Sequence, residues 1–342
     1  MNTLNKRLKE ISDVILEEDL NYIKLFSVIA DYKKLLLEAS GFILKNDEDD
    51  QNIDTDSGKA LSPKFAILCV DDIMRTKRFC LGLYKAIKKA VSEKDGPVRI
   101  IYAGTGPFAT LILPSLTRFT SEEIQLTLLE INQTSYNSLN NLIANFDFSK
   151  YVETIECCDA VNYHISKPEG IDIVVTETLQ KALKKEPQVA ISYNLMSQVS
   201  DHTILIPEEI SLELLLVDMD KSRANKTSMG NPIEYYKHVG SLYKINKKEI
   251  SKYQKDFKNN QPDFEFPEVK VTLPANANRD YHNISIETKI KVYKDQELLI
   301  GESGLTFLTR ITDLNSMLQT FNSVVSTYQC SKNPGVQLRL EI

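Results

Sequence analysis

The chain has 342 residues, enough for two domains of about 150 residues each, and its 42% hydrophobic and 26% charged residues exclude a disordered or collagen-like chain. No apolar run approaches the roughly 18 residues of a membrane-spanning helix, and a formal charge of −6 argues against non-specific binding to nucleic acid. We therefore expect no membrane and no nucleic-acid partner, although the net charge leaves a local basic groove open. The cysteines described next indicate a cytoplasmic setting.

The cysteines and histidines show no metal-ligand spacing. None of the cysteines forms a CxxC pair, and the histidines are scattered along the chain. We therefore predict no metal site and a reducing compartment in which the thiols are unpaired and inert. These residues are Cys69, Cys80, Cys157, Cys158, Cys330, His164, His202, His238 and His282.

Residues 1–60 form a first segment of helices and linker. Apolar side chains recur every three or four positions over residues 3–45, which predicts two or three amphipathic helices. The stretch 46–60 then carries six acids in its first eleven residues. Such a charge run predicts a solvated, mobile linker.

Residues 61–217 alternate between strand-like and helix-like stretches. Strand character is strongest at 98–104, 125–132, 152–160 and 171–177, and the intervening residues favour helices. Among them, 107–119 can form a helix that Pro114 should kink or end. Such alternation predicts a mostly parallel sheet covered on both faces, an α/β fold. Residues 203–217 have strand character around a turn.

Residues 218–342 have a different character. The tyrosine-rich stretch 232–257 is polar and favours a helix in part. After it, short segments that alternate apolar and polar residues are separated by turns, which predicts a C-terminal antiparallel β-barrel or sandwich. We expect this β-rich domain to serve substrate binding or dimerisation.

A glycine turn follows the first strand of the α/β region. Gly104, Thr105 and Gly106 stand between that strand and a helix-like stretch. Glycine permits a sharp turn and close approach of a ligand, and a helix N-terminus favours electron-rich groups. The third glycine of a dinucleotide fingerprint is missing, so an ordinary tight turn remains an alternative.

Carboxylates follow the next two strands. Glu130 ends the second strand and Asp159 ends the third. A carboxylate in the first of these positions can accept hydrogen bonds from both ribose hydroxyls, and ligands of open α/β sheets bind at the carboxyl ends of the strands. Asp159 could contact an adenine amino group.

Two more glutamates follow the fourth strand. Glu177 ends it, and Glu186 comes nine residues later. A pair of carboxylates can share the donors of a planar guanidinium group. The simpler alternative is one buried capping acid and one solvated acid.

The order of these motifs resembles the catalytic core of the protein arginine methyltransferases, which are class I S-adenosylmethionine enzymes. The resemblance covers roughly residues 65–217 and rests on DDIMRT (71–76), AGTGP (103–107), LLEIN (128–132), CCDA (157–160) and the glutamate pair. It implies a Rossmann-like methyltransferase sheet, S-adenosylmethionine as cofactor, and a homodimer.

The resemblance also implies roles for individual residues. Arg75 would pair with the methionine carboxylate of the cofactor, and Gly104, Thr105 and Gly106 would line its backbone. Glu130 would hold the ribose, and Asp159 would lie near the adenine. Glu177 and Glu186 would be the catalytic pair that grips the substrate.

The sequence departs from that family between the two glutamates and in the barrel. Lys181, Lys184 and Lys185 stand where the family has mostly uncharged residues, and the chain has no tryptophan for the family's Thr-His-Trp loop. The lysines would either neutralise the acids or recruit an acidic substrate.

Several functions therefore remain open. The first is methylation of a guanidino or other nitrogen of a peptide or small metabolite, and the second is O- or S-methylation of a small molecule or modified peptide. A catalytically silent scaffold is a third. An NAD-type oxidoreductase is disfavoured, because the third glycine is missing.

Overall fold

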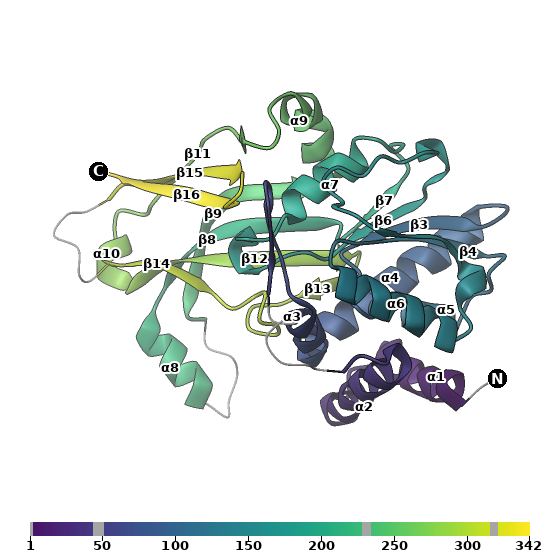
Figure 1. Ribbon diagram of the computed structural model, residues 1–342. Coiled ribbons are helices and arrows are strands. Elements are labelled where there is room, and N and C mark those ends of the chain that lie inside the picture. The colour runs from purple at the N-terminus through teal and green to yellow at the C-terminus, as the bar shows by residue number, and fades with distance from the viewer. Residues whose placement is uncertain (1–2, 44–50, 228–233, 315–320) are drawn as a thin grey trace.

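The computed structural model describes residues 3–43, 51–227, 234–314 and 321–342. The chain forms two lobes side by side, one on a parallel sheet and one on antiparallel sheets, and two N-terminal helices pack beneath the first lobe (Figure 1). The two termini lie at opposite ends of the molecule (Figure 1). Within the described ranges, no helix has both the length and the apolar character needed to span a bilayer.

Two helices open the chain, α1 (Thr3–Ile15) and α2 (Tyr22–Ser40). The side chain of Asn21 accepts a hydrogen bond from the Lys24 N–H and so caps the start of α2. Gly41 ends α2 in the left-handed conformation, with φ 64°. Two helices therefore occupy the stretch for which the sequence predicts two or three.

Buried polar contacts attach these helices to the α/β lobe. The ammonium group of Lys77 donates to the carbonyl of Ile15, 2.9 Å away, at the end of α1. The hydroxyl of Tyr32 in α2 donates to the carbonyl of Thr110 at 2.7 Å. Burial lowers the pKa of Lys77 to about 8. The first contact satisfies a carbonyl at the end of α1, and the second ties α2 to the turn before α5.

A short hairpin replaces part of the expected linker. Strands β1 (Ile53–Thr55) and β2 (Gly58–Ala60) pair with each other, and the N–H of Lys59 donates to the carbonyl of Lys185 at 2.7 Å. The prediction of a mobile linker is therefore wrong for residues 53–60, because backbone pairing holds them whatever their side-chain charge. Residues 44–50 lie outside the described residues.

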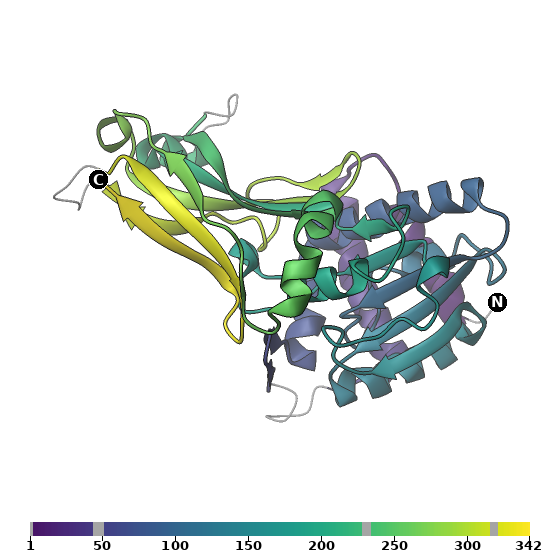
Figure 2. The same cartoon turned by 90° about the horizontal axis from the view of Figure 1, so that it is seen from above.

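The α/β lobe contains a five-stranded parallel sheet in the order β5-β4-β3-β6-β7. Its strands are rich in buried Val, Ile and Leu, as expected for a sheet covered on both faces. Figure 2 shows helices on opposite sides of this sheet. The strands are β3 (Val98–Ala103), β4 (Ile124–Glu130), β5 (Val152–Cys157), β6 (Ile173–Thr176) and β7 (Ile204–Ile206), and the helices are α3 (Pro63–Leu68), α4 (Ile73–Glu93), α5 (Leu113–Leu116), α6 (Gln133–Asn145) and α7 (Gln188–Met196).

The predicted Rossmann-like α/β fold is thereby confirmed. One helix is much shorter than the sequence predicts, since only α5 forms within residues 107–119. Ala109 adopts a left-handed φ of 46°, which interrupts a helix of L-residues. Pro114, at the start of α5, lacks the N–H that a longer helix would need there.

The second lobe consists of two antiparallel sheets, as predicted for the C-terminal region. One has the order β13-β12-β8-β9 with β14 also on β12, and the other has the order β10-β15-β11 with β16 also on β15. The strands are β8 (Glu209–Val217), β9 (Tyr236–Asn246), β10 (Phe264–Glu265), β11 (Val269–Thr272), β12 (Asn283–Tyr293), β13 (Gln296–Leu298), β14 (Thr309–Asp313), β15 (Ser323–Cys330) and β16 (Gly335–Glu341), and the helices are α8 (Met219–Thr227), α9 (Lys247–Asn259) and α10 (Ala277–Asp280).

Aromatic rings fill the space between these sheets. The rings of Tyr243 and Tyr328 stack with their centroids 4.2 Å apart, and Phe266 meets Tyr243 edge-on at 5.1 Å. The change from parallel to antiparallel pairing falls between Ile206 and Glu209, earlier than position 218, where the sequence predicts it. The long apolar run of β8 explains the difference, because both faces of this antiparallel strand are buried.

Candidate active site

A pocket opens at the carboxyl edge of the parallel sheet. It contains about 1050 Å³ of space not filled by atoms, part of it open to solvent. The ends of β3, β4 and β6, the segment after β5, the starts of α4 and α7, and the β1–β2 hairpin contribute to its walls. Ligands of open α/β sheets bind at this edge. Every residue that the sequence singles out for the site lines this pocket, namely Arg75, Gly104, Thr105, Gly106, Glu130, Asp159, Glu177 and Glu186.

Two observations explain why glycine occupies positions 104 and 106, namely the backbone conformation and the space beside each residue. Gly104 has φ 77° and Gly106 has φ 59°, a region that side chains rarely adopt. A Cβ at Gly104 would lie 2.2 Å from Cγ2 of Thr178, whereas a Cβ at Gly106 would meet only Ala66, at 3.4 Å. Gly104 therefore leaves no room for a side chain beside Thr178, and Gly106 has more free space beside it. Both glycines line the pocket, and their contact with a cofactor stays a prediction.

Glu130 is a buried carboxyl at the end of β4, with 6% of its surface exposed. One carboxylate oxygen, Oε1, accepts a hydrogen bond from the N–H of Asn132 at 2.8 Å. Burial raises the pKa of Glu130 to about 7, although backbone N–H groups, including that of Gly106, oppose the shift. A carboxylate held in this way at the pocket wall can accept a hydrogen bond from a hydroxyl group of a ligand.

Asp159 lies beside it, after the end of β5. Its Oδ1 accepts a hydrogen bond from the N–H of Val161 at 2.9 Å, and burial raises its pKa. The side chain of Asn194 donates to the carbonyl of Ala160 at 2.9 Å and anchors the segment to α7. The second and third strand ends thus present two carboxyl groups to the same pocket.

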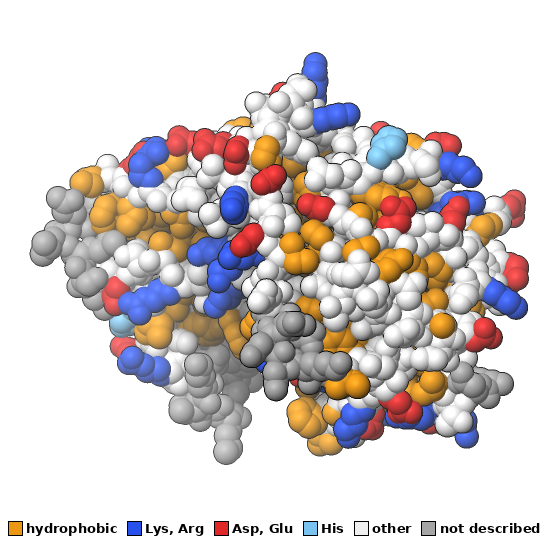
Figure 3. Space-filling model, viewed as in Figure 1, with side chains coloured by type: hydrophobic (Ala, Val, Ile, Leu, Met, Phe, Trp, Pro, Cys, Tyr) orange, Lys and Arg blue, Asp and Glu red, His pale blue; other side chains and the backbone are white. Residues whose placement is uncertain are grey.

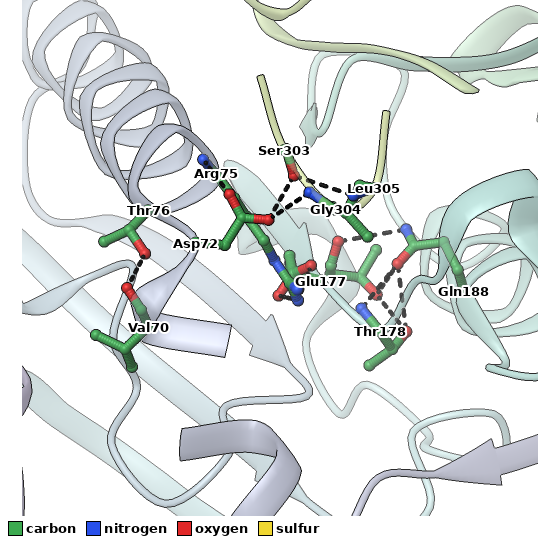
Figure 4. A network of polar contacts seen from close by, with 11 residues as sticks. Val70, Asp72, Arg75, Thr76, Glu177, Thr178, Gln188, Ser303, Gly304 and Leu305 are labelled. Atoms are coloured by element: carbon green, nitrogen blue, oxygen red, sulfur yellow. Dashed lines mark hydrogen bonds and ion pairs between the residues drawn. The ribbon is translucent and has the colours of Figure 1, made fainter. Parts of the chain in front are cut away.

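Arg75 and Glu177 form a buried ion pair at the other end of the site. An Arg75 guanidinium nitrogen lies 2.5 Å from one carboxylate oxygen and 2.6 Å from the other (Figure 4). Burial alone would lower the pKa of Arg75, but Glu177 raises it. The resemblance implies the cofactor carboxylate as a partner of Arg75, which stays a prediction, and the structure shows that Arg75 also pairs with a carboxylate of the protein. Its remaining N–H donors are not used by this pair.

Glu186 is the least compensated of the site carboxyls. It is 6% exposed, and its buried Oε1 has no hydrogen-bond partner among the described residues. Burial raises its pKa to about 8, and the nearby charge of Glu177 adds to the effect. A buried acceptor without a partner is costly, so this oxygen is suited to a donor from a bound molecule.

The side chain of Asp72 links the start of α4, where Arg75 lies, to Ser303 and Gly304 of the second lobe. We call this contact the clasp, and the sequence does not reveal it. Asp72 caps the start of α4 by accepting the N–H of Arg75 at 3.3 Å. Its other oxygen accepts the hydroxyl of Ser303 at 2.6 Å and the N–H of Gly304 at 2.9 Å (Figure 4). The cap could be inferred from an aspartate before a helix. Its barrel partners could not, because they lie more than 200 positions away.

His282 lies outside this pocket. Its Nδ1 accepts the N–H of Met219 at 3.1 Å, and its ligand atoms lie within 4.8 Å of those of Asp218 and Asp220. Asp218 caps α8 by accepting two backbone N–H groups. The cluster therefore already serves the fold, and the absence of a metal site stays a prediction.

Comparisons with known proteins give distant likenesses in structure. The chain matches no protein-family model, and no curated protein matches it. A PRMT6 crystal structure aligns with 75% of this chain and 95% of its own, at 12% identity and a TM-score of 0.46. The PRMT6–SAH crystal structure aligns with 75% of this chain and 96% of its own, at 10% identity and a TM-score of 0.46. A chain of the Trypanosoma brucei PRMT1 enzyme–prozyme complex with AdoHcy aligns with 81% of this chain and 98% of its own, at 9% identity and a TM-score of 0.46. Likeness at this level does not assign a function to the chain.

Proposed function

We propose that the protein is an S-adenosylmethionine-dependent methyltransferase. The observation that carries the proposal is the meeting of the glycine turn, two strand-end carboxyls and the glutamate pair in one pocket. The order of these groups along the chain resembles the arginine methyltransferases. When bound, the cofactor would supply a methyl group on a positively charged sulfur.

The residues present fit such a cofactor. Glu130 is a buried carboxyl at the end of β4. There it would accept hydrogen bonds from the ribose hydroxyls of the cofactor. Asp159 would face the adenine, and Gly106 leaves room for the cofactor backbone. Arg75 would bind the cofactor carboxylate with the guanidinium donors that Glu177 does not use.

Glu177 and Glu186 would act on the substrate. In the reaction that we favour, N-methylation, the two carboxylates accept hydrogen bonds from the N–H groups of a guanidino group or another nitrogen. They thereby orient the lone pair of the nitrogen toward the methyl group. Glu186 would take the departing proton, since its raised pKa of about 8 is close to the range in which a general base works well. A bound cofactor and substrate that fill the pocket would exclude competing water.

A second candidate is O- or S-methylation with one carboxylate as base. The observation in its favour is the ion pair between Arg75 and Glu177. This pair leaves Glu186 as the site carboxyl with a buried, unpartnered oxygen among the described residues.

Titration with S-adenosylhomocysteine tests the proposal. We expect measurable heat of binding in calorimetry, and we expect Glu130→Gln to weaken it by about tenfold or more, since a hydrogen bond to a charged group contributes about 1.5–3 kcal/mol. Glu169→Gln, an exposed acid away from the pocket, is the matched control. Absence of binding to the unmodified protein would remove both methyltransferase versions and favour the scaffold.

The remaining expectations about partners also stay predictions. Exposed apolar side chains of α2, including Ile23 at 87% and Phe26 at 67%, support the expected homodimer. Sedimentation at several concentrations would test it. Cytoplasmic location and the absence of nucleic-acid and membrane partners are predicted from composition alone.

A further inference from the structure

The loop between the two site glutamates is tied to both lobes. Its backbone accepts and donates hydrogen bonds to the hairpin, to β12 and to the β15–β16 region. The contacts run from Lys59 N–H to Lys185 O at 2.7 Å, from Ala182 N–H to Thr288 Oγ1 at 2.6 Å, from Tyr328 O–H to Leu183 O at 2.9 Å and from Lys185 N–H to Pro334 O at 3.2 Å. The loop is therefore held in one conformation.

That conformation is strained. Ala182, Leu183 and Lys185 have φ values of 59°, 49° and 68°, in the left-handed region that residues other than glycine rarely adopt. Each such residue costs on the order of 1 kcal/mol or more, and it persists only where its surroundings fix it, which is common at functional sites. Within this loop, Ala182, Leu183 and Glu186 are buried and the lysines are exposed.

The inward side chains are buried, and the outward ones are lysines. Ala182, Leu183 and Glu186 are buried, whereas Lys181, Lys184 and Lys185 are exposed. None of the three ammonium groups has a hydrogen bond or ion pair to any residue that the structure describes. The stem of Lys184 lies near Gly335, since a Cβ there would be 3.4 Å from its Cγ.

These lysines do not neutralise the site acids. The charges that act on Glu186 are those of Glu177 and Arg75. On the hairpin whose backbone bonds to this loop, Asp54 pairs with Lys59 at 3.1 Å. Figure 3 shows Lys and Arg side chains gathered near the middle of the face on which the hairpin stands. The loop therefore presents negative groups to the pocket and positive groups to the outside.

We propose that the loop lysines Lys181, Lys184 and Lys185 bind acidic residues that flank the methylated side chain of a peptide substrate. This inference rests on the proposed function and narrows its substrate class. The lysines lie on the outer surface and not among the pocket-lining residues, so their anionic partners lie outside the cavity. A small molecule held within the cavity would not reach them, whereas an extended peptide places a residue every 3.3–3.6 Å or so.

The test compares binding of three labelled nine-residue peptides to the full chain in the presence of S-adenosylhomocysteine. Each has a central arginine between two glycines, with three residues on either side that are all Asp, all Gln or all Lys. We expect the Asp peptide to bind about tenfold or more tightly than the Lys peptide at low salt, and we expect the preference to shrink as salt screens the charges.

Two triple variants sharpen the test. The variant K181Q/K184Q/K185Q should lose the preference for the Asp peptide while binding S-adenosylhomocysteine as before. The variant K248Q/K255Q/K258Q removes the same charge from exposed positions on α9 and should keep the preference. A folded first variant that retains the preference, or an unmodified protein that binds the Lys peptide as well as the Asp peptide, would overturn the inference.

The two proposals fail separately. Binding of S-adenosylhomocysteine reports the proposed function, whereas the ratio of peptide affinities reports the role of the lysines. Normal binding of S-adenosylhomocysteine without a peptide preference would leave a methyltransferase whose substrate is not chosen by acidic flanks. Equal loss of the preference in both triple variants would show an effect of net charge alone and would also overturn the inference.

Discussion

The two ends of the pocket are built in different ways. The end with Gly106, Glu130 and Asp159 is made by successive strand ends of one sheet, and its carboxyls are held by backbone N–H groups a residue or two away. The other end contains Arg75, Glu177 and Glu186. Arg75 and Glu177 are 102 sequence positions apart, and the second lobe contacts the start of the Arg75 helix. The first end follows from local structure, and the second depends on the packing of the whole chain.

The largest effect is expected where this packing buries a charge pair. Arg75→Met leaves Glu177 without its cation and should lower the free energy of unfolding by about 3–5 kcal/mol. The double variant R75M/E177Q should recover a large part of the loss, because no uncompensated charge remains. Urea denaturation measures both, and equal stability of the single and double variants would contradict the role of the pair.

At the other end, crowding at the glycine turn should give a smaller but clear effect. Gly104→Ala must adopt a left-handed φ, at about 1–2 kcal/mol, and must also displace Thr178. Gly96→Ala is the matched control, since φ there is 89° with no atom within 4 Å. We expect Gly104→Ala to lower the melting temperature more than Gly96→Ala, and Thr178→Ser to relieve part of the difference. Equal losses would argue against crowding.

Both ends carry a carboxyl with a raised pKa, and this predicts a pH dependence of stability. Burial raises the pKa from 4.5 to about 7 for Glu130 and to about 8 for Glu186. Between pH 4.5 and these values the folded chain binds more protons than the unfolded chain, so the free energy of unfolding falls as pH rises through this window.

Each group contributes a slope of at most about 1.4 kcal/mol per pH unit. Glu186→Gln should flatten the slope up to pH 8, whereas Glu130→Gln should flatten it up to pH 7. Denaturation of the three proteins between pH 5 and 8 provides the comparison. An unchanged slope in Glu186→Gln would show that this carboxyl is solvated.

The smallest expected effect concerns the clasp between the lobes. Ser303→Ala removes the hydroxyl that donates to Asp72 and should cost about 1 kcal/mol, the usual net value of a hydrogen bond. Ser92→Ala, at an exposed serine of α4, should cost less. If the clasp positions Arg75, S-adenosylhomocysteine affinity should fall in Ser303→Ala and not in Ser92→Ala.

Regular local patterns account for the parts of the fold that the sequence predicts well. Alternating apolar strands and helices predict the parallel sheet. Glu130 at the end of β4 and Asp159 shortly after β5 are expected at its carboxyl edge, because all parallel strands end there. The hairpin at residues 53–60 could not be predicted in this way. Its acidic side chains resemble those of a linker, and its partners lie more than 120 residues further on.

The sequence by itself therefore determined the strand ends and the residue types that they carry. Only the tertiary structure decided that Arg75 pairs with Glu177, that Asp72 meets Ser303 and that the loop lysines point outward. The physical reason is the separation along the chain over which each effect acts. Backbone geometry places neighbours within a few residues, but burial and charge pairing between distant segments depend on which surfaces pack together.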